Sequence, residues 1–221
     1  DNTAVGYFSL VFNTTGGKNT AFGKGASQLN TTGYHQTAVG YHALNQCTTG
    51  QENTAVGYFS LTNATTGNNN VAVGVDSLRV NTTGIQNVAV GDRSGDSVTT
   101  GEKNTFIGRN AGATITTGSS NICVGSQAGA NQTTDSNQLW IARDGTQNSN
   151  AATWIYGTSS GACYQGNNSS SWTTASDERI KKDIVDSTEG LAKIDALQVR
   201  NFNYRTPEEI TVDGLTGCDA S

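Results

Sequence analysis

A repeat with a period of 17 residues organises residues 1–142 of this 221-residue chain. The segment Asn-Thr-Ala-Val-Gly at residues 2–6 recurs in related forms at this spacing, and so does a second glycine that follows Thr-Thr. Both glycine series recur every 17 residues with no insertion between copies. They therefore identify one structural unit that is repeated along the chain. The glycines that close the first segment are Gly6, Gly23, Gly40, Gly57, Gly74, Gly91, Gly108 and Gly125.

Each unit has the features of one turn of a β-solenoid. The alternation of Thr or Val, Ala, and Val, Phe or Ile predicts a short strand. The closing glycine suits a corner that needs positive φ or a close approach of backbone, and Asn-Thr-Thr-Gly is typical of a turn. Parallel pairing of successive units would add about 4.8 Å per turn. We therefore expect an all-β fold, a parallel β-roll or β-helix.

The interior of this solenoid is predicted to contain two apolar columns. One is the residue before each corner glycine, and the other is a leucine five residues further on, as in Leu44 and Leu61. The alanine column, such as Ala38 and Ala55, would face the opposite way and pack against identical chains, most simply in a homotrimer; a monomeric solenoid is the alternative. The predicted core residues are Val5, Phe22, Val39, Val56, Val73, Val90, Ile107 and Val124.

Composition explains why stacking is needed and excludes several classes of protein. Only 34% of the residues are hydrophobic and 14% are charged, and the chain contains 27 glycines. Ladders of identical Asn and Thr side chains would satisfy the polar groups of such a chain. With a net charge of -5, we expect no nucleic-acid partner. The sequence has no apolar run of the length that a membrane helix needs, so we expect no membrane insertion.

The cysteines and histidines give no metal-binding pattern. The four cysteines are far apart and form no Cys-x-x-Cys pair, and the two histidines lie inside the repeat. We therefore expect small buried or exposed thiols, no metal site and no cofactor. Because the sequence opens at Asp1 inside a repeat, we expect a fragment of a longer protein.

Two regions follow the repeat. Residues 143–175 are rich in Ser, Asn and Gly, and their spaced aromatic residues predict short strands or a compact knob. Those rings could pack at a trimer axis, which we favour, or stack on carbohydrate. Charged residues then rise from 9% in residues 1–175 to 35% in residues 176–221. A capping box at Asp186 and Glu189, followed by a helical apolar face and an alternating segment, predicts a small α+β module.

This last region resembles a known family. The stretches SDERIKKDI and LQVRNFNYR are similar to the start of the endosialidase-type intramolecular chaperone domain, which ends many phage tail spikes and tail fibres. The NTAVGYxSL and NTTG array resembles tail-fibre solenoids and, more loosely, heads of trimeric autotransporter adhesins. The resemblance implies that the domain trimerises the fibre and then cleaves itself. It assigns Ser176 as the nucleophile, Lys181 as the base, and Ala175–Ser176 as the scissile bond.

These observations together predict the distal part of a homotrimeric tail fibre. Its partners would be its own copies, a host cell-surface receptor, for which a glycan is one candidate, and other tail-fibre or baseplate proteins through a preceding segment. It would be assembled in the host cytoplasm and reside in the virion. Self-cleavage is the one activity expected, with no external substrate. The alternative is an adhesin on a bacterial surface, and a minor alternative is an ice-binding solenoid.

Overall fold

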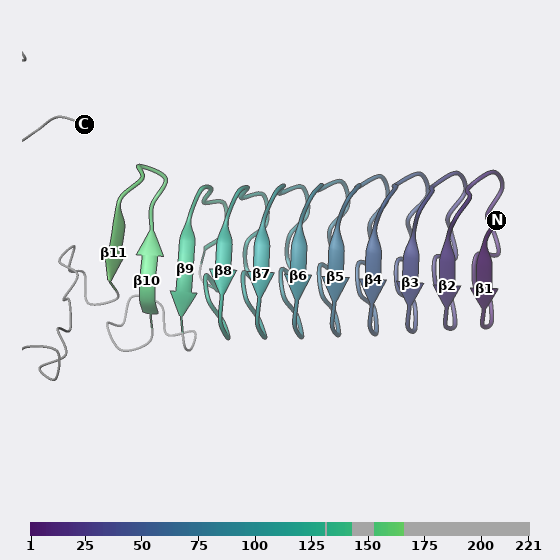
Figure 1. Cartoon of the computed structure of the whole chain (residues 1–221), viewed down its shortest axis with the longest axis horizontal. Coiled ribbons are helices and arrows are strands. Elements are labelled where there is room, and N and C mark those ends of the chain that lie inside the picture. Colours follow the sequence, from purple (N-terminus) through teal and green to yellow (C-terminus); the bar gives the residue numbers. More distant parts are fainter. Residues whose placement is uncertain (131, 143–152, 166–221) are drawn as a thin grey trace, which may run out of the picture. The chain divides into compact units, whose positions relative to one another are not determined.

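The computed structural model describes residues 1–130, 132–142 and 153–165. The chain divides into two units, residues 1–173 and 174–221, and every described residue lies in the first. In the described part there are strands and turns and no helix, and the strands form one sheet in chain order (Figure 1). The strands are β1 Thr3–Val5, β2 Thr20–Phe22, β3 Thr37–Val39, β4 Thr54–Val56, β5 Val71–Val73, β6 Val88–Val90, β7 Thr105–Ile107, β8 Ile122–Val124, β9 Leu139–Ala142, β10 Thr153–Gly157 and β11 Cys163–Gln165.

The predicted β-solenoid is confirmed. Strands β1 to β9 pair in parallel, and each residue pairs with the equivalent residue one repeat later, as Ala38 does with Ala55. The connecting segments of successive turns stack beside the sheet in the same register (Figure 1). Backbone hydrogen bonds join them, such as Leu44 N–H to Ser60 O at 3.0 Å. The period of the sequence is therefore the length of one turn of the rod.

The two faces of each short strand are the reverse of those predicted. The middle residue points into the rod, and Ala38, Ala55 and Ala72 are fully buried. The residue before the corner glycine lies on the outer face, where Val5 is 50% exposed and Phe22 58%. The prediction that this column forms the solenoid core is wrong for Val5, Phe22, Val39, Val56, Val73, Val90, Ile107 and Val124, none of which is buried.

The inward strand position has room for little more than a methyl group because leucine enters from the opposite wall. Leu44, Leu61 and Leu78 are fully buried, as the sequence predicted. Their backbones have φ values of 52°, 49° and 47°, in a region that costs an L-residue about 1–2 kcal/mol. Burial of the leucine side chain offsets that cost. A third buried column completes the interior and comprises Asn30, Cys47, Ala64, Asn81, Val98 and Ile115.

From the sixth turn onward the interior is filled differently. Glycine replaces leucine at Gly95, Gly112 and Gly129, and the inward strand position becomes larger at Phe106 and Cys123. A Cβ atom on Gly95, in the turn before Phe106, would lie 2.7 Å from the Phe106 ring. A Cβ atom on Gly112, in the same turn as Phe106, would also clash with this ring. The change that the sequence shows at Gly95 is thus an exchange of volume between two facing walls.

A buried asparagine ladder runs along one edge of the sheet. Each side-chain oxygen accepts a hydrogen bond from the backbone N–H of the equivalent residue one turn later, as Asn53 Oδ1 does from Asn70 N–H at 2.9 Å. The amide nitrogen donates to a glycine carbonyl of its own turn, as Asn53 Nδ2 does to Gly67 O at 2.8 Å. A threonine ladder is also present, in which Thr48 Oγ1–H donates to Thr65 O. These ladders satisfy the polar groups that stacking buries.

The solenoid ends in an antiparallel hairpin. Strand β10 pairs antiparallel with β9, and β11 pairs antiparallel with β10. The rings of Trp140, Tyr156 and Tyr164 stack across these strands, with centroids 5.6 and 5.0 Å apart. The described part of region 143–175 therefore contains short strands, as expected. Its role at a trimer axis stays a prediction.

Candidate functional site

The predicted self-cleavage residues lie outside the described part of the chain. Ser176 and Lys181 fall in residues 166–221, and so do the expected helix and the alternating segment that follows it. The nucleophile, the base and the Ala175–Ser176 bond stay predictions. The surfaces that the structure does describe belong to the rod.

The corner glycines place the chain where no other residue fits. Their φ values lie between 115° and 139°, a conformation that only glycine adopts readily. From Gly6 to Gly108 each also faces the corner glycine of the next turn, so that a Cβ on Gly6 would lie 2.5 Å from Gly23 O. The contact is with backbone, which cannot rotate away. These glycines hold each strand over the next and so fix the geometry of the outer sheet face.

The outer sheet face, defined as the first and third residues of β1 to β8, is an uncharged and largely apolar surface. It contains only Thr, Val, Ile and Phe, and no charged residue. Exposed positions include Phe22, Ile107 and Ile122, at 58%, 44% and 45%. Figure 1 shows the strands side by side along the rod, so this surface has no interruption over eight strands.

This face replaces the alanine column as the candidate contact surface. From Ala21 to Ala89 the alanines cannot touch another chain, because they are enclosed within a single rod. The outer face has the properties that an assembly surface needs, since large exposed apolar patches mark interaction sites. The sequence carried a signal for this arrangement. Where the middle strand residue becomes the large Phe106, the leucine of the facing wall becomes glycine, which marks the middle position as the inward one.

The thiols of the rod are buried and inert. Cys47 and Cys123 are free and buried, and Cys163 is free and exposed. Burial raises the pKa of Cys47 to about 11 and that of Cys123 to about 12, because a thiolate in the rod would lose its hydration. Hydrogen bonds with Gly50 and Gln36 lower the pKa of Cys47 in part. Neither cysteine is therefore a nucleophile at neutral pH.

No group of three or more His, Cys, Asp or Glu side chains among the described residues could hold a metal ion. The same residues include no helix of the length and apolarity that crossing a membrane requires.

Comparison with known proteins gives one match. Residues 176–215 match the Peptidase S74 family, described as the chaperone of endosialidase. The match begins at Ser176, where the charged segment of the sequence starts. No curated protein and no solved structure matches the chain significantly. The match, with the β-solenoid before it, points to a protein of the phage tail-fibre or tail-spike type that carries a C-terminal chaperone domain.

Proposed function

We propose that the chain is the distal part of a homotrimeric bacteriophage tail fibre. The rod is a stiff shaft that presents an attachment surface to a host cell-surface receptor, and the segment from residue 176 is an intramolecular chaperone. One observation carries this proposal, namely a parallel β-solenoid that is followed in sequence, after region 143–175, by a chaperone-of-endosialidase segment. Other tail-fibre or baseplate proteins would attach the fibre to the virion. Assembly takes place in the host cytoplasm.

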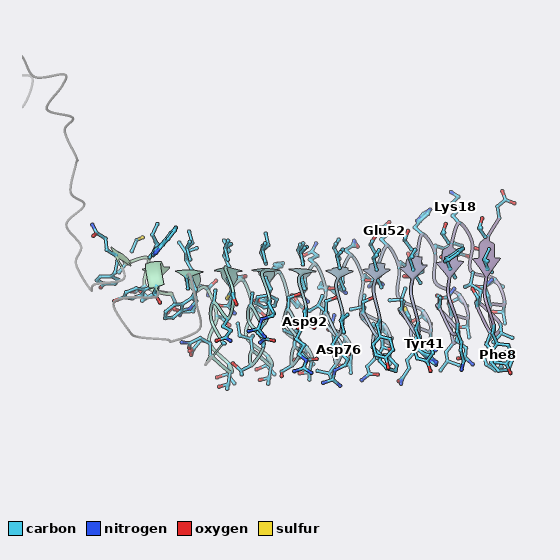
Figure 2. All side chains as sticks on the ribbon, turned by 90° about the horizontal axis from the view of Figure 1, so that it is seen from below. Phe8, Lys18, Tyr41, Glu52, Asp76 and Asp92 are labelled. Carbon is cyan, nitrogen blue, oxygen red and sulfur yellow. The ribbon has the colours of Figure 1, made fainter. Side chains whose placement is uncertain are left out.

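The outer sheet face supports assembly with identical chains. Three rods can turn this face toward a common axis and so remove the valine and isoleucine side chains from water. Each square ångström of apolar surface removed contributes about 25 cal/mol. The face itself contains no charged residue, and Lys18 and Glu52, which lie on the same side of the rod (Figure 2), are of opposite sign. A second copy of the same chain is the occupant that a repeated, uncharged surface fits best, because identical registers bring identical residues together.

The assembly is tested with a pair of valines from one turn. Val73→Asp places a carboxylate on the outer sheet face, and Val75→Asp places one on an exposed flank position. Multi-angle light scattering should give a trimeric mass for the wild type and Val75→Asp and a monomeric mass for Val73→Asp. A wild-type chain that is monomeric at high concentration would contradict the proposed trimer.

Release of the chaperone segment follows from the serine and lysine assigned by resemblance. Neutral Lys181 takes the proton of the Ser176 hydroxyl, and Oγ attacks the carbonyl carbon of Ala175. The C–N bond breaks, the amide nitrogen of Ser176 gains the proton, and an ester joins Ala175 to Ser176. Water then hydrolyses this ester to a carboxylate at Ala175 and a free hydroxyl. A lysine of lowered pKa can activate serine in this way without histidine.

Intact-mass spectrometry of the protein tests the cleavage. The wild type should yield a fragment that ends at Ala175, whereas Ser176→Ala and Lys181→Ala should remain whole. Lys182→Ala is the matched control, since it removes the neighbouring lysine and should still be cleaved. A wild-type chain that stays whole would contradict the proposed self-cleavage.

A further inference from the structure

A hollow of about 560 Å³ lies on one flank of the rod, away from the outer sheet face. Three successive turns, which begin with β4, β5 and β6, supply its lining. Figure 2 shows that Tyr41, Asp76 and Asp92 lie along this flank, and that Lys18 and Glu52 lie on the opposite side of the rod, which carries the sheet. Its volume is within the range of small-molecule sites. The residues that line it are Tyr58, Phe59, Asp76, Arg79, Arg93 and Asp96.

One wall of the hollow is an aromatic platform. The rings of Tyr41 and Tyr58 stack with centroids 5.2 Å apart, and Phe59 meets Tyr58 edge-on at 4.4 Å. Tyr58 is 48% exposed, so part of its ring is open to a ligand. The platform continues along the flank through Lys24, whose ammonium lies 5.5 Å from the Tyr41 ring centroid. Stacking on neighbours fixes these rings before any ligand arrives.

The facing wall is polar, and its charges balance. Arg79 binds Asp96 through two hydrogen bonds of 2.8 and 3.3 Å, and its Nε lies 3.8 Å from Asp76 Oδ1. Arg93 is exposed, and no carboxylate among the described residues lies within ion-pair distance of it. The wall thus combines a fixed ion pair with a guanidinium whose donors are available. Two arginines and two aspartates leave no net charge.

We propose that this hollow binds a neutral saccharide. A sugar ring has an apolar C–H face, which fits the exposed face of Tyr58, and a rim of hydroxyls. Those hydroxyls can accept from the planar guanidinium of Arg93 and donate to the carboxylates of Asp76 and Asp96. An aromatic wall with a few fixed polar groups is the usual composition of a small-ligand site. The inference rests on the proposed role in host attachment, for which it names the receptor class.

An anionic ligand fits this hollow less well. Asp76 and Asp96 would repel a phosphate or a sugar carboxylate, and Arg79 is already neutralised by Asp96. A purely apolar ligand would leave the charged wall dehydrated and without new partners, which is unfavourable. With Arg79 paired to Asp96, the lining keeps one positive group, Arg93, and one negative group, Asp76. An uncharged, hydroxyl-rich ligand can hydrogen-bond to both and therefore fits the lining best.

Saturation-transfer NMR and titration of the whole chain test the proposal. The probes are short oligosaccharides of glucose, galactose, mannose and N-acetylglucosamine, with uronic acid oligomers and inorganic phosphate as anionic arms. At least one neutral oligosaccharide should bind the wild type. Tyr58→Ala and Arg93→Ala should each bind it about tenfold more weakly, because each removes one of the two walls.

Tyr34→Ala is the matched control, since Tyr34 is also an exposed tyrosine but does not line the hollow. It should bind like the wild type, and circular dichroism should show that all three variants remain folded. Binding to no neutral sugar, equal binding by Tyr58→Ala, or preference for an anionic probe would each overturn the proposal. Light scattering is measured on the same samples. A monomeric wild type that binds sugar would contradict the trimeric fibre and not the saccharide site.

Discussion

In the turns that carry β3, β4 and β5, the inward strand residue is alanine. The opposite wall contributes Leu44, Leu61 and Leu78, which hold their backbones at positive φ. In the turns that carry β7 and β8, the large residue is on the strand and glycine is on the opposite wall. Glycine adopts the same positive φ without strain, at 60° for Gly112. The corner glycines and the asparagine ladder run through both halves.

The difference shows what the repeat has to conserve. The backbone register stays constant, whereas the wall that provides the interior volume can change, as a comparison of Ala55 and Leu61 with Phe106 and Gly112 shows. Phe106 lies between Gly95 and Gly112, and either glycine would clash with its ring if it carried a Cβ. The size of an inward strand residue such as Phe106 therefore depends on the size of two residues of the facing wall. One of these is in its own turn and the other is in the turn before.

Phe106→Ala should give the largest change, because the glycines opposite cannot fill the space that it leaves. The free energy of unfolding in urea should fall by about 3–5 kcal/mol, as for other buried phenylalanines. Phe22→Ala is the matched control on the outer face and should cost less than about 1 kcal/mol in the unassembled chain. Equal losses for the two variants would contradict the assignment of inner and outer faces.

Gly112→Ala should have the next largest effect. The new methyl group would overlap the Phe106 ring, and overpacking of this kind costs about 1–3 kcal/mol. Gly17→Ala is the control, since its Cβ would make an ordinary 3.6 Å contact with Tyr34. Combining Phe106→Ala with Gly112→Leu should recover part of the loss, because it restores the arrangement of the β4 turn. Strictly additive losses would rule out the exchange of volume.

Gln36→Asn should stabilise the rod by about 1 kcal/mol. Gln36 replaces the ladder asparagine in the third turn, and its Oε1 is buried without a hydrogen-bond partner. The ladder hydrogen bond from the Asn53 backbone N–H to the residue one turn before is therefore missing. The shorter side chain would restore that link. The reciprocal variant Asn70→Gln should lose a similar amount. A destabilised Gln36→Asn in thermal unfolding would show that the longer amide is preferred at this position.

Ionisation of the buried thiols should have the smallest effect on stability. It should have none at neutral pH, where the thiols are protonated in both the folded and the unfolded chain. Their pKa values are raised from 9.0 to about 11 for Cys47 and about 12 for Cys123. The unfolded chain therefore ionises first, and stability present below pH 9 is lost as pH rises toward these values. Relative to Cys47→Ala or Cys123→Ala, the wild type should lose stability above pH 9. A constant difference from pH 7 to 11 would contradict burial of the thiols.

The period of the sequence was sufficient to predict the solenoid, its parallel register, the corner glycines and the buried leucines. It did not determine which strand face is inside. Alternation places Ala and Val on opposite faces but does not say which face is enclosed, and the larger residue is ordinarily the buried one. Here leucine from the facing wall reverses that choice, and Phe106 with Gly112 was the clue. The flank hollow combines Tyr58, Arg79 and Asp96 from three turns, at positions that the repeat does not conserve.

Cysteine accessibility in β8 tests the central claim, which is that the middle residue of each strand is enclosed in one rod and the third residue faces other copies. One chain keeps Cys123 as its single cysteine, and a second carries Cys123→Ala and Val124→Cys without the other cysteines; both are labelled with a thiol reagent across a range of protein concentration. The Cys123 thiol should stay unreactive at every concentration, because it is buried. The Val124→Cys thiol should react at low concentration and become protected as trimers form. Reaction at Cys123 together with protection of the Val124→Cys thiol in the monomer would contradict the enclosed middle position.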